Sequence, residues 1–289
     1  MNILILGATG EIGHTFCKTL AKNHSISALM RKNSNLESVN FFESVLAESH
    51  CHFIQDFKNF DLVENKIKKI NPEIIVNCLG VIKHRKECEE GIAETAYINS
   101  DLPHLLAKTC IDNNIRFIHL STDCVFSGEK GNYKESDSPD PTDYYGKSKM
   151  LGEVNIPHAL TLRTSFIGPA LFNKTGLFEW VKQQKNKTIN GYTNAIYSGL
   201  TTIAFSKILD KIIQDHPHLN GLLNISSEPI SKFDLIRLLN KKFQLNMTIN
   251  PDNTFSCDRS LNSIDFRKKT GITVPSWDKM IDELYHYNM

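Results

Sequence analysis

Three side chains in the middle of the chain have the chemistry to move a proton on or off a carbonyl oxygen. Tyr145 and Lys149 stand four residues apart, a spacing that places both side chains on one face of a helix. Thr122 follows the apolar run Phe117 to Leu120, which is typical of a buried strand, so its hydroxyl is expected at a strand end. A phenol, an ammonium one turn away and a hydroxyl suit general acid–base catalysis. The pattern predicts the active site of a reductase.

A glycine-rich turn near the start of the chain predicts a nucleotide-binding site. Residues 7–13 read Gly-Ala-Thr-Gly-Glu-Ile-Gly and separate an apolar run, residues 2–6, from a helical pattern. Glycines at this spacing allow a tight turn and let the backbone approach a pyrophosphate at the N-terminus of the helix. The place of the motif between a strand and a helix makes it specific. The predicted cofactor contacts in this turn are Gly7, Thr9, Gly10, Glu11, Ile12 and Gly13.

The end of the second predicted strand indicates which cofactor binds. Ile26 to Met30 form this strand, and Arg31 follows it where an acidic residue would accept hydrogen bonds from a ribose 2′-hydroxyl. An arginine there accommodates a 2′-phosphate instead. The sequence therefore favours NADPH over NADH. The alternative is that Arg31 is a solvated charge at a strand end.

Residues at later strand ends are further candidates. Asp56 follows a third predicted strand, where it suits either the adenine edge or the N-cap of a helix. Gly80 follows a fourth strand, and its backbone is expected against the cofactor ribose. Lys83 and His84 are candidates for substrate phosphates or plain surface charges. Asn99 lies among apolar helical residues, where it either orders a water near the catalytic lysine or is a satisfied core amide.

The alternation of apolar runs and helical patterns predicts an α/β fold. Ligands of such folds bind at the carboxyl ends of parallel strands, where every motif above falls. We expect a Rossmann-type, doubly wound parallel sheet over residues 1–164, to which residues 197–225 return. Residues 165–289 are expected mainly to form a smaller mixed α/β lobe that binds substrate, in which residues 186–194 are a polar segment.

Composition excludes several classes of protein. The 289 residues carry a formal net charge of +1, so no basic surface for nucleic acid is predicted, and no apolar run has the length of a membrane span. The apolar N-terminus lacks a basic lead and reads as a strand rather than a signal peptide. The seven cysteines are scattered without a Cys-x-x-Cys pair, which favours a reducing cytoplasm over disulfides. His216-Pro217-His218 is better explained by a turn than by a metal, and no metal site is predicted.

Together these motifs resemble the extended short-chain dehydrogenases/reductases, and within them the dTDP-4-dehydrorhamnose reductase group. The resemblance covers nearly the whole chain and rests on residues 7–13, Ser121–Gly128, Gly131–Asp137, Tyr145–Glu153, Arg163–Ser165 and Arg259–Ser263. It implies catalytic roles for Thr122, Tyr145 and Lys149, and a place near the substrate for Asp123. The chain departs from the group at Cys124, Phe166 and Ser260, where Tyr, Trp and Pro are common.

The Trp position touches the sugar in the group, so Phe166 is a candidate substrate contact. Arg259 is the candidate clamp for the substrate pyrophosphate, because its planar fork suits phosphate oxygens. We expect NADPH-dependent reduction of the C4 ketone of a nucleotide-linked 4-keto-6-deoxy sugar, for surface polysaccharide biosynthesis. Tyr145 would supply the proton, with its pKa lowered towards the operating range by Lys149 and the nicotinamide.

Two other readings stay open on the residues alone. One is a nucleotide-sugar epimerase or dehydratase that retains NAD, since dehydratases place acidic residues where Asp123 stands. The other is a non-catalytic NADP-binding regulatory subunit, against which the intact Thr122, Tyr145 and Lys149 argue. A nucleotide sugar is the expected small-molecule partner, and a homodimer is an open expectation.

Overall fold

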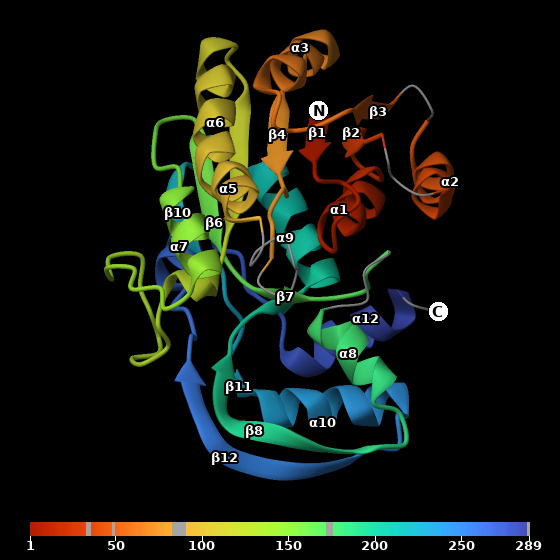
Figure 1. The fold of residues 1–289 in the computed structure, drawn as a ribbon, viewed down its shortest axis with the longest axis vertical. Helices are drawn as coiled ribbons and strands as arrows, with labels where there is room; N and C mark the ends of the chain where they lie inside the picture. Colours follow the sequence, from red (N-terminus) through yellow and green to blue (C-terminus); the bar gives the residue numbers. More distant parts are fainter. Residues whose placement is uncertain (33–35, 48–49, 83–90, 172–175, 288–289) are drawn as a thin grey trace.

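The centre of the molecule is a seven-stranded parallel sheet (Figure 1). The computed structural model describes residues 1–32, 36–47, 50–82, 91–171 and 176–287, with the backbone alone for 36–39. In the order β10-β6-β5-β4-β1-β2-β3, the sheet comprises β10 (Gly221–Asn224), β6 (Ala159–Arg163), β5 (Arg116–Ser121), β4 (Ile74–Asn77), β1 (Asn2–Leu6), β2 (Ser25–Arg31) and β3 (Cys51–Ile54). From β1 the chain adds β2 and β3 on one side, and then β4, β5 and β6 on the other side, so the strand order reverses between β1 and β4 as in doubly wound sheets. The predicted Rossmann-type fold is confirmed.

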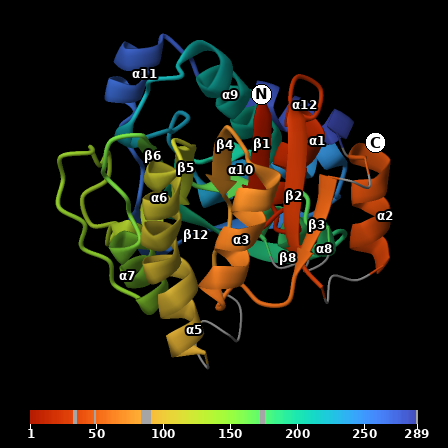
Figure 2. The ribbon, with the colours of Figure 1, turned by 90° about the horizontal axis from the view of Figure 1, so that it is seen from above.

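Helices cover both faces of this sheet (Figure 2). One face carries α1 (Gly13–Leu20), α9 (Thr202–Asp215) and part of α12 (Trp277–Tyr287). The other face carries α3 (Phe60–Ile70) and α6 (Leu102–Asp112), with α5 (Ile92–Ala96), a π-helical turn η2 (Tyr97–Asp101) and α7 (Tyr144–Leu151) beside them. The helix α2 (Leu36–Val45) lies outside β3.

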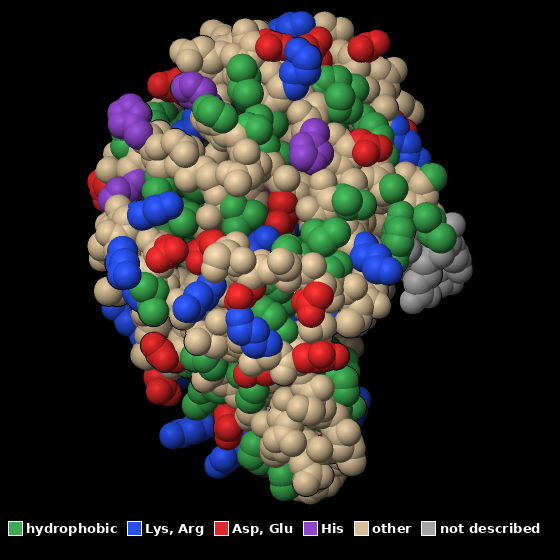
Figure 3. Space-filling model, turned by 90° about the vertical axis from the view of Figure 1, so that its left-hand side faces the viewer, with side chains coloured by type: hydrophobic (Ala, Val, Ile, Leu, Met, Phe, Trp, Pro, Cys, Tyr) green, Lys and Arg blue, Asp and Glu red, His purple; other side chains and the backbone are tan. Residues whose placement is uncertain are grey.

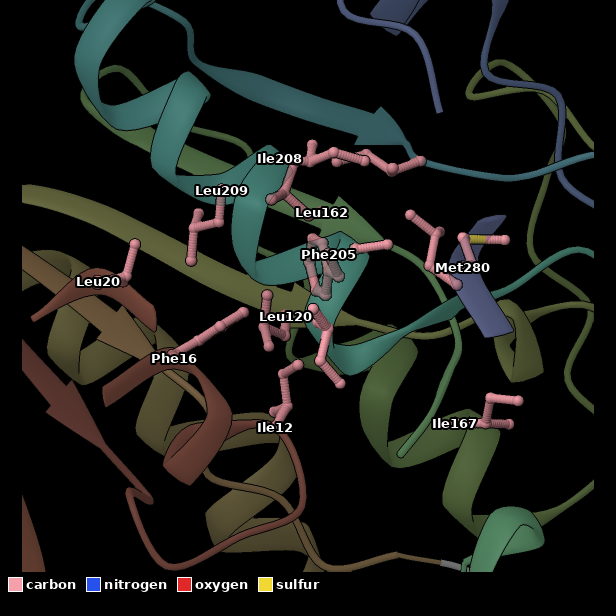
Figure 4. Packing of buried hydrophobic residues seen from close by; sticks show 14 of the residues in the cluster. Ile12, Phe16, Leu20, Leu120, Leu162, Ile167, Phe205, Ile208, Leu209 and Met280 are labelled. Atoms are coloured by element: carbon pink, nitrogen blue, oxygen red, sulfur yellow. The ribbon is translucent and has the colours of Figure 1, made fainter. Parts of the chain in front are cut away.

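Strand side chains alternate between the two cores that the helices create. In β1, Ile3 and Ile5 pack into the core under α1 and α9, whereas Leu4 and Leu6 pack into the core under α3 and α6. A strand covered on both faces therefore reads as a continuous apolar run. Figure 4 shows the first core, in which Phe16 of α1 lies beside Phe205 of α9, with their ring centroids 5.4 Å apart. Full burial of each such side chain stabilises the fold by about 1.5–3 kcal/mol.

A smaller lobe lies beyond the carboxyl ends of the strands, below the sheet in Figure 1. Its three-stranded sheet has the order β11 (Ile230–Ser231), β8 (Thr188–Tyr197) and β12 (Thr248–Asp258). The helices α8 (Leu177–Gln183), α10 (Lys232–Phe243) and α11 (Ile264–Thr270) belong to this part of the chain. The short strands β7 (Phe166–Ile167) and β9 (Leu200–Thr201) pair with each other beside it.

The polar segment 186–194, for which no helix or strand was predicted, is mostly occupied by β8. Exposed side chains alternate along β8 with Gly191, Ala195 and Tyr197, which are buried. The strand pairs in parallel with β12, about sixty residues later in the chain. Since its outer face is solvated and carries polar residues, the segment lacks the apolar run by which a buried strand is recognised.

The surface and the cysteines complete the description. Acidic and basic side chains are interspersed over the face shown in Figure 3. Among the helices that the structure describes, none has both the length and the apolar character needed to cross a bilayer. Across the same described ranges, no group of His, Cys, Asp and Glu side chains has the arrangement of a metal site. The thiols of Cys17, Cys51, Cys78, Cys110, Cys124 and Cys257 are free.

Candidate active site

The glycine turn joins β1 to α1 with little room to spare. Gly7 has a φ of +76°, a left-handed conformation that side chains disfavour, and its carbonyl accepts a hydrogen bond of 3.0 Å from the Gly10 N–H. A side chain on Gly13 would overlap that same carbonyl, so this glycine packs the start of α1 against the turn. The backbone is consequently open to a ligand at the N-terminus of α1, which fits the pyrophosphate of a dinucleotide.

A cavity of about 290 Å³ extends from this turn along the carboxyl ends of β1, β2, β4 and β5. Of the predicted cofactor and substrate residues, it is lined by Gly7, Thr9, Gly10, Glu11, Ile12, Arg31, Asp56, Gly80, Tyr145, Lys149 and Phe166. The cavity is also lined by residues that were not predicted from the sequence, including Phe57, Cys78, Ala170 and Leu171. The structure therefore gathers residues from distant parts of the chain around one space that begins at the glycine turn.

The start of α7 brings the phenol of Tyr145 to the end of β5. The Asp143 side chain caps this helix, accepting a 2.8 Å hydrogen bond from the Gly146 N–H. A side chain at Gly146 would overlap the Cys124 carbonyl, so the helix approaches the chain after β5 as closely as a backbone can. As a result, the Thr122 hydroxyl lies near the half-buried Tyr145 phenol.

Lys149 lies one turn further along α7, almost fully buried. Its Nζ donates a 2.7 Å hydrogen bond to the Leu120 carbonyl, which ties the helix to β5. Burial lowers the pKa of Lys149 to about 8, while the nearby Glu153 carboxylate and the Cys78 thiol act in the opposite direction. The ammonium therefore titrates close to the physiological range.

The predicted lowering of the Tyr145 pKa is not what the structure shows. Burial raises the pKa of Tyr145 well above its ordinary value, and the Cys124 thiol adds to the rise, while the nearby Thr122 hydroxyl opposes it. Desolvation disfavours the phenolate more than the surrounding donors favour it. At neutral pH Tyr145 is thus a protonated phenol, the state needed to give a proton to a ketone oxygen.

Asn99 was predicted to contact the cofactor, but the structure places it in the core. Its Oδ1 accepts a 2.9 Å hydrogen bond from the Val81 N–H, and its Nδ2 donates to the Val81 carbonyl and to the Ser148 hydroxyl. The side chain is fully buried and does not line the cavity. It is a satisfied core amide that holds residues 80–82 against α7, the alternative that the sequence left open.

Asp56 lines the cavity, and it is not the N-cap of α3, the helix that follows it. Its Oδ1 accepts a 3.0 Å hydrogen bond from the Lys58 N–H, whereas Asn59 is the N-cap of α3. The adenine edge stays a prediction for Asp56. Lys83 and His84, proposed for substrate phosphates, lie outside the described residues.

Arg259 is anchored by three contacts within the protein, and its role as a clamp for the substrate pyrophosphate stays a prediction. Its Nε donates 2.9 Å to the Phe126 carbonyl, its Nη1 lies 3.5 Å from the Cys124 sulfur, and its Nη2 lies 3.4 Å from the Thr142 hydroxyl. The guanidinium therefore joins the segment after β12 to the loop after β5. Asp123 lies next to it, buried, and accepts a 3.1 Å hydrogen bond from the Thr122 hydroxyl.

Two ionisable groups at the site have environments that the sequence did not reveal. Burial raises the pKa of Glu11 to about 8, opposed by the Gly168 N–H and reinforced by the Glu179 carboxylate. Lys232, the first residue of α10, has its ammonium near Asp123. No local pattern distinguishes Lys232 from a surface lysine, since only the packing of the lobe brings it to the site.

A doubly wound sheet, a glycine turn after β1, and Tyr145 and Lys149 one helical turn apart on a cavity wall are the arrangement of an extended short-chain dehydrogenase/reductase. Sequence comparison agrees with this class and narrows it. The chain belongs to the family described as the RmlD substrate binding domain, whose sequence model matches residues 1–176.

Several individual proteins are similar to this chain. A probable low-salt glycan biosynthesis reductase of Haloferax volcanii is 31% identical over 58% of this chain, which spans only 54% of that protein. A dTDP-4-dehydrorhamnose reductase of Aggregatibacter actinomycetemcomitans is 28% identical, over 80% of this chain and 76% of its own. The crystal structure of a hypothetical dTDP-4-dehydrorhamnose reductase from Sulfolobus tokodaii superposes with a TM-score of 0.79 at 25% identity, covering 96% of this chain and 98% of that one.

Proposed function

We propose that this protein uses NADPH to reduce the C4 ketone of a nucleotide-linked 4-keto-6-deoxy sugar, in the synthesis of a surface polysaccharide. The observation that carries the proposal is that Tyr145 and Lys149, one helical turn apart on α7, both line the cavity that begins at the glycine turn. The names of the relatives support the substrate class, since they include a dTDP-4-dehydrorhamnose reductase and a glycan biosynthesis reductase.

The residues of the cavity fit NADPH. The glycine turn offers backbone N–H groups to its pyrophosphate, and Arg31 at the end of β2 lies on the cavity wall where the 2′-phosphate is expected. When bound, the cofactor supplies a hydride to the ketone carbon. Lys149 would hold its nicotinamide ribose, since the ammonium lies on the same wall as Tyr145.

The chain supplies the proton and the orientation of the ketone. Thr122 would donate a hydrogen bond to the ketone oxygen and set its position, and the protonated phenol of Tyr145 would give the oxygen its proton. Burial favours the neutral phenol before the transfer. Afterwards the Lys149 ammonium, one turn away on α7, would stabilise the phenolate. Such general acid catalysis typically contributes about 10²–10⁴-fold, and positioning contributes further.

The remaining expectations belong to the same proposal. We assign the substrate contacts mainly to residues 165–289, apart from the segment 197–225 that includes α9 and β10. The free thiols of the described cysteines support a reducing cytoplasm. A homodimer stays a prediction.

The test replaces one tyrosine and uses its neighbour as the control. Tyr145→Phe removes the proposed proton donor, whereas Tyr144→Phe removes a hydroxyl that donates 2.7 Å to the Ile92 carbonyl. We expect Tyr145→Phe to lower turnover of dTDP- or UDP-linked 4-keto sugars by about 10²–10⁴-fold, with the NADPH dissociation constant unchanged. Tyr144→Phe should keep its turnover. NADPH consumption and NMR of the product give the readout, and unchanged turnover in Tyr145→Phe would refute the assignment.

A further inference from the structure

Three ionic side chains form a charged cluster next to the catalytic threonine: Asp123, Lys232 and Arg259. They come from the loop after β5, the start of α10 and the segment after β12, respectively. The carboxyl of Asp123 is buried, and both cations lower its pKa while burial, the larger effect, raises it. Within the described ranges no ion pair joins Asp123 to either cation, so the attraction acts across a gap.

The two cations differ in what holds them. The Arg259 guanidinium directs its nitrogens at Phe126, Cys124 and Thr142. The Lys232 ammonium lies 3.8 Å from the centre of the Tyr197 ring, and it has no hydrogen-bond acceptor among the described residues. A lysine has three N–H donors, so those of Lys232 are open to a ligand. The side chain is half-buried, which leaves the ammonium recessed but reachable.

The Tyr197 ring attracts the Lys232 ammonium but accepts no ordinary hydrogen bond, so the N–H donors of this recessed cation stay unfilled. Burial lowers the pKa of Lys232 to about 8, although the Asp123 carboxylate acts in the opposite direction. A cation that has lost part of its hydration without gaining acceptors recovers free energy when an anion binds. Arg259 also faces the Asp143 carboxylate, so Lys232 is the cation of the cluster that is left to attract an anion. The cluster therefore favours an anionic ligand.

Position identifies which anionic group of the substrate is involved. Lys232 acts on Asp123, which directly follows Thr122, the residue proposed to contact the ketone of the hexose. In a nucleotide sugar, the phosphate bonded to the hexose is nearer to that end than the phosphate bonded to the nucleoside. We propose that Lys232 binds the sugar-side phosphate of the nucleotide-sugar substrate and acts as a positioning residue. This inference rests on the proposed function.

The experiment measures nucleotide binding separately from turnover. Titration calorimetry of the full chain with dTDP and UDP, and with dTMP and UMP, compares ligands with and without the second phosphate. A charge-assisted hydrogen bond contributes about 1.5–3 kcal/mol, which corresponds to about ten- to hundredfold in affinity. We expect Lys232→Met to weaken diphosphate binding by that factor and to change monophosphate binding by less than about twofold. Lys232→Arg should restore part of the affinity.

The control is Lys241→Met, an exposed lysine in the last turn of the same helix, which should bind diphosphates as the wild type does. In steady-state assays, Lys232→Met should raise KM for the keto sugar more than it lowers kcat, with NADPH affinity retained. Equal diphosphate affinity in the two variants would overturn the inference, as would an equal loss for mono- and diphosphates. Failure of wild-type dTDP and UDP binding at millimolar concentration would also overturn it. Absence of keto-sugar turnover with intact diphosphate discrimination would instead refute the proposed function.

Discussion

Glu153 and Arg163 form a buried, bidentate ion pair at the back of the active site. Arg163 Nε and Nη2 each donate a 2.7 Å hydrogen bond to one of the two Glu153 carboxylate oxygens. Ser121 donates a further 2.7 Å hydrogen bond to the same carboxylate. The pair therefore joins the end of α7 to β5 and β6, and holds the helix that carries Tyr145 beside the strand that leads to Thr122.

We expect Glu153→Gln to lower the free energy of unfolding by about 3–5 kcal/mol, because it leaves the Arg163 charge buried without its partner. The matched control is Asp112→Asn, which breaks the exposed pair with Lys108 and should leave the free energy of unfolding nearly unchanged, because solvent screens that pair. Urea denaturation followed by circular dichroism measures both. A Glu153→Gln protein as stable as Asp112→Asn would contradict this structural role.

The Lys149 ammonium predicts an alkaline limit to activity. Its pKa is about 8, so the charge is present below that pH and is lost as the pH rises through it. We expect kcat/KM to fall above about pH 8, by about tenfold per pH unit once Lys149 is neutral. The Glu153 carboxylate raises this pKa, so Glu153→Gln should move the fall to lower pH. Profiles recorded below the melting temperature of the variant test this; superimposable profiles would rule out the coupling.

We expect Arg31 to make the protein prefer NADPH over NADH. It lies on the cavity wall at the end of β2, where it would meet a 2′-phosphate. Arg31→Ala should raise KM for NADPH about ten- to hundredfold and leave KM for NADH nearly constant, since NADH lacks that phosphate. Lys32→Ala is the control, because Lys32 is also exposed but does not line the cavity. An equal effect of Arg31→Ala on both cofactors would argue against the contact.

Gly13 tests the packing of the glycine turn. A side chain there would overlap the Gly7 carbonyl, so Gly13→Ala must displace the turn, at a cost of about 1–3 kcal/mol. Gly271→Ala is the control: Gly271 has a φ of +68° with open space around it, and it ends α11 away from the cavity. We expect both variants to melt earlier than the wild type. Only Gly13→Ala should lose NADPH affinity in fluorescence titrations, and retention of that affinity would disconnect the turn from the cofactor.

Local patterns were enough to predict the sheet and most walls of the cavity. The strands of a doubly wound sheet are buried on both faces, so each is a short apolar run that ends in its own motif. The carboxyl ends of parallel strands meet at one edge, which explains why the residues from Gly7 to Phe166 could be assigned to one site before their positions were known. The smaller lobe was harder to predict, because the solvated outer face of β8 carries polar residues and gives no apolar run that would indicate its pairing with β12.

By itself the sequence determined the fold class, the glycine turn and the helical spacing of Tyr145 and Lys149, since each depends on residues that are neighbours in the chain. Only the tertiary structure decided that Tyr145 stays a phenol, that Arg259 is bound by backbone and side-chain groups, and that Lys232 faces Asp123. These properties depend on desolvation and on contacts between distant segments. A side chain becomes buried, and distant segments come into contact, only when the chain has packed.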